Sequence, residues 1–477
     1  MRKVRIRRAR IAALAAGAGM LAAAVVAAAA TAAPAAGTPA GGQPRLLIKP
    51  GIVRLAVTNR SGPTTTAQCR QAFGISCFEP GQLRTAYNLA PLYAKGITGK
   101  GATIVIVDSF GSPTIRGDLT AFDKQFGYPA PPSFKIIAPA GRIPAYNPNN
   151  SDMVGWAGET TLDVEYAHAL APGASILLAE TPVSETEGVT GFPQIVRAEE
   201  YVIDNKLGSV ISQSFSATEE TFKNYAQLKP LRAAYKDALS HHVTVLAASG
   251  DTGAADVGRD GTTYYLSPVT TWPDSDPWVT AVGGTQLKLS GGKYTSVAWN
   301  DTYNKATNEF FAVDAGPTPF ASGGGKSEFF TRPAWQNGVQ SVVGTRRGVP
   351  DIAMSGACNG AVNVYSTFGG QTPGWSLICG TSEATPEFAA IVALADQVAG
   401  HPLGLINPTL YALSARHARG LVDVTSGNNT VSFFQGAANK EYTVKGYPAR
   451  TGYDMVTGVG TVNAAYFVYE LAGIPGH

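Results

Sequence analysis

Short apolar runs alternate with longer segments of helical periodicity along most of the chain. The apolar runs are rich in β-branched residues and end at turn residues, which is typical of buried parallel strands; they are residues 102–108, 175–179, 209–214, 243–248 and 278–282. The helical segments are residues 83–95, 159–170, 192–205, 225–240 and 383–399. This alternation predicts an α/β fold, a parallel sheet flanked by helices in a single large domain.

The two ends of the chain follow other patterns. Residues 1–33 combine a basic start, an apolar run and small residues, which predicts an export signal peptide, with a single membrane anchor as the alternative. Residues 34–80 are rich in Pro, Gly, Thr and Ala, so we expect a short N-terminal extension or linker before a domain at 81–477. Residues 423–460 are dense in Gly, Asn and Thr and predict loops with fixed turns.

Charged residues make up 15% of the chain and are unevenly placed. The whole chain has a net charge of +3, but from Glu79, the first acidic residue, it carries 26 bases and 34 acids. This acidic body disfavours a nucleic-acid partner, and we expect no membrane contact once the signal is removed.

The chain has four cysteines, Cys69, Cys77, Cys358 and Cys379. None forms a C-x-x-C motif, which argues against a zinc ribbon or a thioredoxin-type site. In an exported chain, four cysteines favour two disulfides. One of the three possible pairings joins Cys69 to Cys77 and Cys358 to Cys379, and the sequence does not choose among them.

The sharpest local signal is Cys379-Gly-Thr-Ser382-Glu-Ala-Thr-Pro386, followed by an apolar helical run. Pro386 suits a first helical turn, which would place Ser382 at a helix N-terminus. There, free backbone N–H groups can stabilise an oxyanion that forms on a substrate. The alternative is an ordinary helix N-cap.

A nucleophilic serine needs a base, and none of the six histidines stands in an H-G-T setting. The chain offers Glu159 and Asp163, which lie four residues apart and hence on one helix face. Repulsion between the two would make one hold its proton more strongly, so Glu159 can serve as base to Ser382 with Asp163 behind it. The alternative is a solvated acidic face.

Two further aspartates end apolar runs. Glycines flank Asp251 in Ser-Gly-Asp251-Thr-Gly, which predicts a tight turn that aims its side chain beyond the strand. If buried near Ser382, Asp251 would be protonated and could donate a hydrogen bond to an oxyanion; otherwise it caps its own turn. Asp108 resembles the aspartate of a His-based triad, but without a matching histidine we interpret it as structural.

Together these motifs resemble the sedolisin family, the serine-carboxyl peptidases with a subtilisin-like fold. The resemblance covers about residues 80–470, and the order of its motifs is specific; they are Glu159-x-x-x-Asp163, residues 249–253, 278–285, 322–325, 347–351, 380–382 and 403–408. It implies that Ser382 is the nucleophile, Glu159 the base, Asp163 its partner and Asp251 the oxyanion acid.

The resemblance also implies binding sites. Ser214, Phe215 and Ser216 match the strand edge that pairs with an extended peptide substrate. A calcium site is implied at the side chains of Asp423 and Asp454 and the carbonyls of Val424, Arg450 and Gly452, a set of oxygen ligands that suits Ca²⁺. Arg450 stands where the family usually has glycine, and residues 34–80 are shorter than the family's prosegment.

The sequence therefore predicts a secreted, extracellular and monomeric peptidase that forms an acyl-enzyme. A carboxylate base has a reference pKa of about 4.3, and Asp251 must stay protonated, so we expect activity in acid. One alternative is a catalytically silent relative that serves as a binding or surface protein. Another is a subtilisin-type hydrolase with His168 as base, although His168 lies on an apolar helix typical of core residues.

Overall fold

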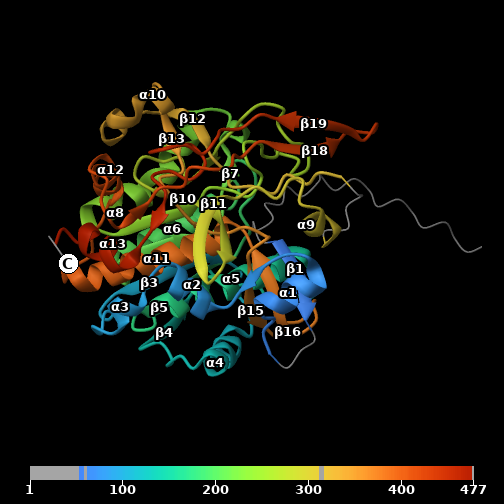
Figure 1. Cartoon of the computed structure of the whole chain (residues 1–477). Coiled ribbons are helices and arrows are strands. Elements are labelled where there is room, and N and C mark those ends of the chain that lie inside the picture. The colour runs from blue at the N-terminus through green and yellow to red at the C-terminus, as the bar shows by residue number, and fades with distance from the viewer. Residues whose placement is uncertain (1–52, 59–61, 311–315, 475–477) are drawn as a thin grey trace, which may run out of the picture. The chain divides into compact units, whose positions relative to one another are not determined.

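The computed structural model describes residues 53–58, 62–310 and 316–474, so the predicted signal peptide lies outside the described residues. Its main sheet has the strand order β11-β10-β8-β6-β3-β5-β4, with β14 paired to β10 (Figure 1). These strands are β3 (Thr103–Ser109), β4 (Phe134–Ile137), β5 (Ser175–Thr181), β6 (Val210–Gln213), β8 (Thr244–Ala248), β10 (Thr280–Ser290), β11 (Lys293–Ala298) and β14 (Ile352–Ser355). All neighbouring pairs are parallel except β10 and β11, which confirms the predicted parallel α/β sheet.

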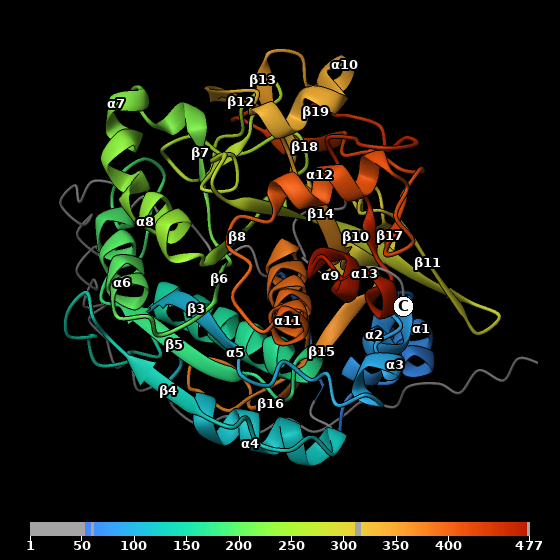
Figure 2. The same ribbon diagram turned by 90° about the vertical axis from the view of Figure 1, so that its left-hand side faces the viewer.

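Alternate residues of the central strands face opposite sides of this sheet, and helices cover both sides. Ile104 and Ile106 of β3 lie in one core, and Val105 and Val107 lie in a second. The first core includes α5 (Ser151–Leu170), α11 (Thr381–Ala399) and α13 (Ala464–Leu471); the second includes α6 (Phe192–Asp204) and α8 (Ala233–His241). Figure 2 shows α6 and α8 on one side of the strands and α11 on the other. Burial of both faces explains why these strands are continuous apolar runs.

The other described elements surround this sheet. They include α4 (Ile115–Phe126), α9 (Lys305–Phe310), α10 (Gln340–Val343), α12 (Asn407–Ala415), β7 (Ala217–Thr218), β9 (Thr271–Trp272), β12 (Gly325–Thr331), β13 (Arg346–Val349), β17 (Leu421–Val422) and β20 (Thr461–Val462). None of the helices in the described ranges is both long and apolar enough to cross a bilayer.

Two predicted helices are interrupted. The segment 83–95 forms α2 (Pro80–Ala86) and α3 (Ala90–Tyr93), because Asn88 between them has a left-handed backbone with φ of 57°. The segment 225–240 forms α7 (Tyr225–Leu228), a 3₁₀ turn and α8, and the turn contains Pro230, which lacks a backbone N–H.

The C-terminal loop region contains a hairpin that the sequence did not predict. Its strands are β18 (Val431–Gln435) and β19 (Lys440–Val444), which pair antiparallel. Phe433 of this hairpin packs against Tyr264, with ring centroids 4.4 Å apart. The expectation of loops throughout 423–460 was therefore wrong for this part.

Part of the predicted N-terminal extension has regular structure. It contains β1 (Val53–Thr58), α1 (Thr66–Phe73) and β2 (Cys77–Phe78). With β15 (Ala361–Ser366) and β16 (Gly374–Cys379), these strands form a second sheet in the order β1-β16-β15-β2. Disulfides join Cys69 to Cys77 and Cys358 to Cys379, which selects one of the three pairings that the sequence left open.

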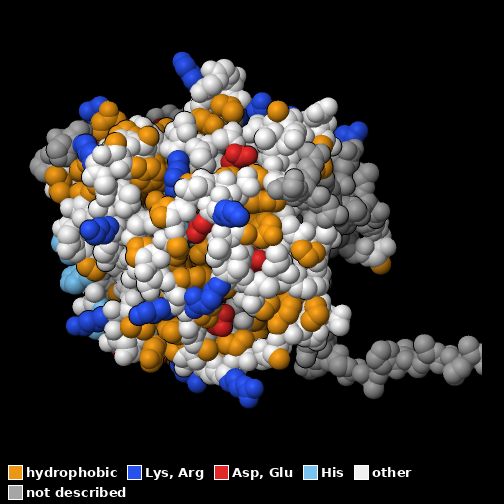
Figure 3. All heavy atoms as spheres, turned by 90° about the horizontal axis from the view of Figure 1, so that it is seen from below, with side chains coloured by type: hydrophobic (Ala, Val, Ile, Leu, Met, Phe, Trp, Pro, Cys, Tyr) orange, Lys and Arg blue, Asp and Glu red, His pale blue; other side chains and the backbone are white. Residues whose placement is uncertain are grey.

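Most acidic side chains of the described ranges lie inside the protein. Nineteen aspartates and glutamates there are buried, whereas Arg347 is the one buried arginine or lysine. On the face seen in Figure 3, lysine and arginine side chains are spread singly over the surface with few acidic side chains among them. The excess of acidic residues in the folded body therefore lies largely in its interior, not on its surface.

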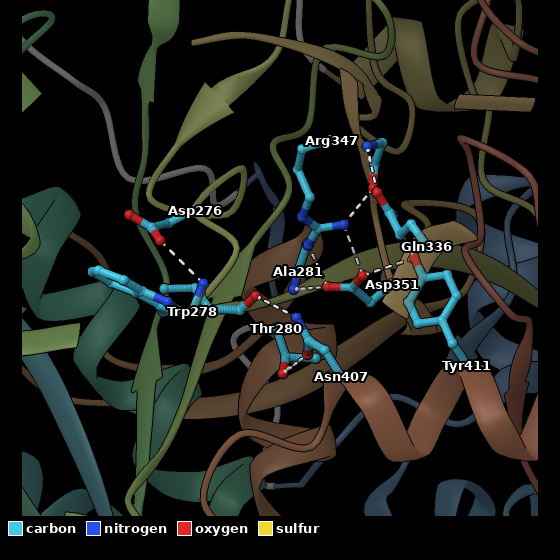
Figure 4. Close-up of polar contacts among 11 residues, drawn as sticks. Asp276, Trp278, Thr280, Ala281, Gln336, Arg347, Asp351, Asn407 and Tyr411 are labelled. Atoms are coloured by element: carbon cyan, nitrogen blue, oxygen red, sulfur yellow. Dashed lines mark hydrogen bonds and ion pairs between the residues drawn. The ribbon is translucent and has the colours of Figure 1, made fainter. Parts of the chain in front are cut away.

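Arg347 and Asp351 form a fully buried ion pair beside β10 (Figure 4). The two nitrogens Nη1 and Nη2 of Arg347 lie 2.8 and 2.6 Å from the oxygens Oδ1 and Oδ2 of Asp351. The Tyr411 hydroxyl and the Ala281 backbone N–H each donate to Asp351 at 2.9 Å. Burial opposes the charge of Arg347, but Asp351 outweighs this effect and raises the pKa of the guanidinium. This motif links β13, β10 and α12.

Candidate active site

Ser382 lies at the start of α11, as the sequence predicts. It is the second residue of the helix and is 1% exposed. Gly380 lies two residues before Ser382, between β16 and α11, and its φ of 137° is one that glycine adopts readily. Its N–H donates to the Gly356 carbonyl at 2.8 Å. Ser382 therefore lies in the first helical turn, where the Thr381 N–H donates to Asp251 and the Glu383 N–H donates to the Gly380 carbonyl.

Pro386 is not in the first turn of α11, contrary to the prediction, but inside the helix. Because proline has no N–H, the Ser382 carbonyl four residues earlier lacks its usual helical donor. The Ser214 hydroxyl lies 3.5 Å from that carbonyl oxygen. The proline thus leaves the Ser382 carbonyl oxygen as an acceptor within reach of Ser214, the residue that follows β6.

Glu159 and Asp163 occupy consecutive turns of α5, and both are completely buried. The Ser214 hydroxyl donates to Oδ1 of Asp163 at 3.0 Å. The Ser382 hydroxyl is close enough to favour the charged form of Glu159, although no hydrogen bond of standard geometry joins them. Such contacts often tighten only when substrate binds. The alternative of a solvated acidic face is excluded, because Glu159 and Asp163 are both completely buried.

The electrostatics of these two carboxyl groups favour their neutral forms. Burial raises the pKa of Glu159 well above its usual range, and the charge of Asp108 raises it further. Burial is also the largest cause that raises the pKa of Asp163, and the negative charges of Asp108 and Glu159 raise it further. A group of carboxyl groups this close can hold few negative charges at once, so its protons are shared.

Asp108, which the sequence analysis interpreted as structural, belongs to the same group. It lies near the carboxyl end of β3, is fully buried, and neither of its oxygens has a hydrogen-bond partner in the described part of the chain. Burial raises its pKa to about 7. Its place at the carboxyl end of a central parallel strand was the signal that could have identified it.

Three more buried glutamates that the sequence analysis did not single out surround this group. Glu185 accepts a hydrogen bond from Ser109 at 2.8 Å, and burial raises its pKa to about 8. Glu383 and Glu387 lie on the first two turns of α11, and burial raises the pKa of both well above the usual range. The site therefore contains more carboxyl groups than a simple acid–base pair needs.

Asp251 is held against the residue that precedes Ser382. Its oxygen Oδ1 accepts hydrogen bonds from the Thr381 backbone N–H at 2.6 Å and from the Thr381 hydroxyl at 2.8 Å. Gly250 and Gly253 have φ of 96° and 66°, so the tight turn predicted around Asp251 is present. Oxygen Oδ2 is buried and without a hydrogen-bond partner among the described residues, and burial raises the pKa of Asp251 to about 7.

Ser214, Phe215 and Ser216 follow β6, but two of their side chains face inward. Ser214 is 1% exposed, and Phe215 is 3% exposed and packs edge-on against Trp156 and Phe192. The Phe215 side chain is thus part of the second core. Backbone pairing with a substrate at these residues stays a prediction.

The residues of the predicted calcium site lie close together. The Gly452 N–H donates to Asp423 at 2.9 Å, and the Arg450 N–H donates to Asp454 at 3.0 Å. Within the described ranges, the carbonyls of Val424, Arg450 and Gly452 accept no hydrogen bond, so their oxygens are free to bind a cation. Within the described ranges, no group of three or more His, Cys, Asp or Glu side chains is arranged to hold a metal ion. The predicted calcium site has only two carboxylates, and its other ligands would be backbone carbonyls.

His168 is not near the nucleophile's partners. Its atom Nε2 lies 2.8 Å from the Pro129 carbonyl oxygen and 3.3 Å from Oδ1 of Asp123. The side chain is completely buried at the far end of α5 from Glu159. His168 is therefore a core residue held through Nε2, with Nδ1 buried and without a partner among the described residues, and this placement argues against the subtilisin-type alternative.

Comparison with known proteins relates this geometry to a family. Residues 140–438 match the family model described as "Subtilase family". The chain is 31% identical to kumamolisin of Bacillus sp. (strain MN-32), over 82% of this chain and 63% of that protein. It is 30% identical to sedolisin of Pseudomonas sp. (strain 101), over 67% of this chain and 50% of that protein. Human tripeptidyl-peptidase 1 is 28% identical over 65% of this chain and 51% of that protein.

A solved structure agrees with these matches. The structure of Pseudomonas sedolisin, a serine-carboxyl proteinase complexed with two molecules of pseudo-iodotyrostatin, superimposes with a TM-score of 0.67 at 25% identity. The superposition covers 84% of this chain and 99% of that one. The chain spans 63% of the length of kumamolisin and 50% of the length of sedolisin. It belongs to the subtilase family and, within it, to the sedolisin family.

Proposed function

We propose that this protein is a serine-carboxyl peptidase that hydrolyses peptide bonds in acid through an acyl-enzyme on Ser382. The observation that carries the proposal is the setting of Ser382, which has Glu159 on one side and Asp251, bonded to Thr381, on the other. Membership of the sedolisin family supports it. The silent-relative alternative has no comparable support, because all four positions hold the residues that the chemistry needs.

In the proposed reaction, ionised Glu159 takes the proton of the Ser382 hydroxyl as its oxygen attacks the substrate carbonyl carbon. The carbonyl oxygen becomes an oxyanion, which receives a hydrogen bond from protonated Asp251 and from the N-terminal N–H groups of α11. Glu159 then gives its proton to the leaving amine, and the carbon–nitrogen bond breaks. A water molecule, deprotonated by Glu159, hydrolyses the resulting ester.

The pH range of the reaction follows from two opposite requirements. Glu159 must be ionised, and burial together with the charge of Asp108 makes this harder as pH falls. Asp251 must be protonated, and its pKa of about 7, raised by burial, sets the upper limit. The enzyme should therefore lose activity as the pH rises through 7, and the raised pKa of Glu159 should set the lower limit of its acid range.

The substrate would be an extended peptide paired with the backbone of residues 214–216. Relatives include proteins named tripeptidyl-peptidase 1, so removal of N-terminal tripeptides is a second form of the same activity.

We also propose that the protein is exported as a monomer by means of the signal at residues 1–33. The two disulfides suit an oxidising compartment.

Calcium would be bound by the side chains of Asp423 and Asp454 with the carbonyls of Val424, Arg450 and Gly452. Bound Ca²⁺ would hold the C-terminal loops together by neutralising the two carboxylates. Because a ligand that binds only the folded state raises its stability, millimolar Ca²⁺ should raise the melting temperature over that in EGTA. Asp423→Asn should remove this difference, and an unchanged calcium response in that variant would contradict the assignment.

The direct test of activity is cleavage of a peptide library at pH 3 to 8 in the presence of Ca²⁺, with Ser382→Ala as the control. Cleavage in acid that is absent from the control supports the proposed function. The lengths of the fragments distinguish internal cleavage from tripeptide removal. Absence of cleavage by a folded, calcium-saturated wild-type protein would favour the binding or surface role instead.

A further inference from the structure

We propose that residues 64–78, here named the N-terminal clamp, position Ser382 and the base helix for the reaction and form a working part of the active site. The inference rests on the proposed function for its kinetic readout only. It concerns a segment that the sequence presents as an extension or linker.

The clamp is a closed structural unit. The disulfide Cys69–Cys77 joins α1 to β2, and α1 begins with a reciprocal capping box between Thr65 and Gln68. Gly74 ends the helix in a left-handed conformation, with φ of 69°. The disulfide and the helix caps restrict the conformations that this segment can adopt. A rigid segment can fix the positions of the residues that it contacts, whereas a flexible one would only cover them.

Two asparagines attach the clamp to the strand pair that leads to the nucleophile. Asn363 on β15 accepts from the Thr64 N–H at 2.8 Å and donates to the carbonyls of Thr64 and Phe78 at 3.0 and 3.1 Å. Asn359 accepts from the Ser76 N–H at 2.8 Å. Asn363 is completely buried, so its three bonds are shielded from water.

The clamp also shares a core with the residues next to Ser382. Cys69, Ile75 and Cys77 pack in one cluster with the second disulfide, Cys358–Cys379, and with Leu377 and Trp299. Cys379 ends β16 and precedes Ser382 by three residues. Trp299 and Thr381 both lie against Gly284, where a Cβ atom would approach their side chains to 2.7 and 3.5 Å. The clamp therefore packs, through this shared cluster, against the residues that adjoin the turn 379–382.

Asn363 connects the clamp to the base helix as well. Its backbone carbonyl accepts a hydrogen bond from the Tyr166 hydroxyl at 2.9 Å, and Tyr166 follows Asp163 by three residues on α5. Asn363 is also paired with Leu377 across β15 and β16. One residue thus joins the clamp, the nucleophile strand and the helix that carries Glu159, which makes it a positioning residue for both partners.

The test compares two amide deletions, Asn363→Ala on β15 and Gln397→Ala near the C-terminal end of α11, the helix that begins beside Ser382. Asn363→Ala removes the three side-chain bonds from Asn363 to the clamp and leaves the bond from the Ser76 N–H to Asn359 in place. Gln397→Ala is the matched control, because Gln397 binds the backbone of residues 96–100 through four bonds at the C-terminal end of the same helix. We expect Asn363→Ala to lower kcat roughly ten- to a hundred-fold with KM within about twofold, since small displacements of reacting groups cost this much. Gln397→Ala should keep kcat.

Both variants are assayed well below their melting temperatures, so that a change in stability alone does not lower kcat. Unchanged kcat in a folded Asn363→Ala variant would overturn the proposal. If that variant does not fold, the pair Cys69→Ala and Cys77→Ala, which opens the clamp from inside, replaces it with the same expected loss.

Hydrogen exchange separates this proposal from the proposed function. Amides of residues 374–384 should exchange faster in Asn363→Ala than in Gln397→Ala, whether or not the wild type cleaves peptides. Equal exchange in the two variants would reject the clamp. A wild type without turnover would reject only the peptidase activity.

Discussion

Asp351 and Asp163 are both completely buried in the same domain, yet their surroundings are opposite. Asp351 pairs with Arg347 and accepts further bonds from Tyr411 and Ala281, so both its oxygens are satisfied. Asp163 accepts one bond from Ser214, and its other oxygen has no partner within the described ranges. Its charged neighbours are carboxyl groups rather than a cation.

The difference separates a structural charge from a functional one. A buried carboxylate with a complete set of donors is fixed in one protonation state and serves the fold. A group of buried carboxyl groups with few donors changes its protonation with pH and with ligands, as active sites do. Removing the charge of Asp351 should therefore lower the free energy of unfolding. Replacing a carboxyl group of the active site should instead lower the activity.

The largest expected effect is that of Glu159→Gln on turnover. The amide has the shape of the acid but cannot accept the serine proton, so kcat/KM should fall about 10³-fold or more. The melting temperature should stay level or rise, because an unpaired buried carboxyl group is removed. The measurement is kinetics and thermal unfolding of the same sample. Retained activity, or a large drop in melting temperature, would contradict the functional side of the comparison.

Asp351→Asn should show the reverse pattern. It leaves Arg347 buried without its counter-charge, which should lower the free energy of unfolding by about 3–5 kcal/mol. Urea unfolding measures this loss, with Glu159→Gln as the matched acid-to-amide control. A stability equal to that of the wild type would mean that Arg347 and Asp351 are not the structural pair described here.

A smaller effect is the dependence of stability on pH. Burial raises the pKa of Glu185 to about 8 and that of Glu219 and Asp396 to about 7. Groups with a raised folded-state pKa contribute full stability below their unfolded pKa of about 4.3 and lose it as the pH rises through 7 to 8.

The melting temperature should therefore be higher at pH 5 than at pH 8, by at least about 4 °C. Differential scanning calorimetry in matched ionic strength gives the comparison. A melting temperature that rises from pH 5 to pH 8 would show that these carboxyl groups are ionised and paired in the folded protein.

Much of the fold could be predicted from the chain because its strands are buried on both faces. Residues 102–108 and 243–248 are continuous apolar runs for that reason, and the structure places β3 and β8 there. The helix that starts beside Ser382 was predicted from Pro386 and the apolar run that follows it, although Pro386 lies inside the helix and not in its first turn. The break at Asn88 could not, since its left-handed backbone depends on tertiary contacts.

The site was harder to predict where it depends on what surrounds a side chain. Spacing placed Glu159 and Asp163 on one face of a helix, but it could not reveal that this face is internal. Asp108 was interpreted as structural because no matching histidine accompanies it, and the sequence did not reveal that its charge acts on Glu159. Residues 64–78 have the composition of a linker, and their order comes from a disulfide and from Asn363, which lies about 300 residues away along the chain.

The most direct test of a carboxyl-based reaction is the dependence of kcat/KM on pH from 3 to 8 for the wild type and for Asp251→Asn. Because Asp251 must be protonated and has a pKa raised by burial to about 7, wild-type activity should fall as the pH passes 7. The asparagine cannot lose a proton, so in Asp251→Asn the remaining activity should persist to higher pH. A wild-type maximum near pH 8, or the same decline in both proteins, would contradict the account.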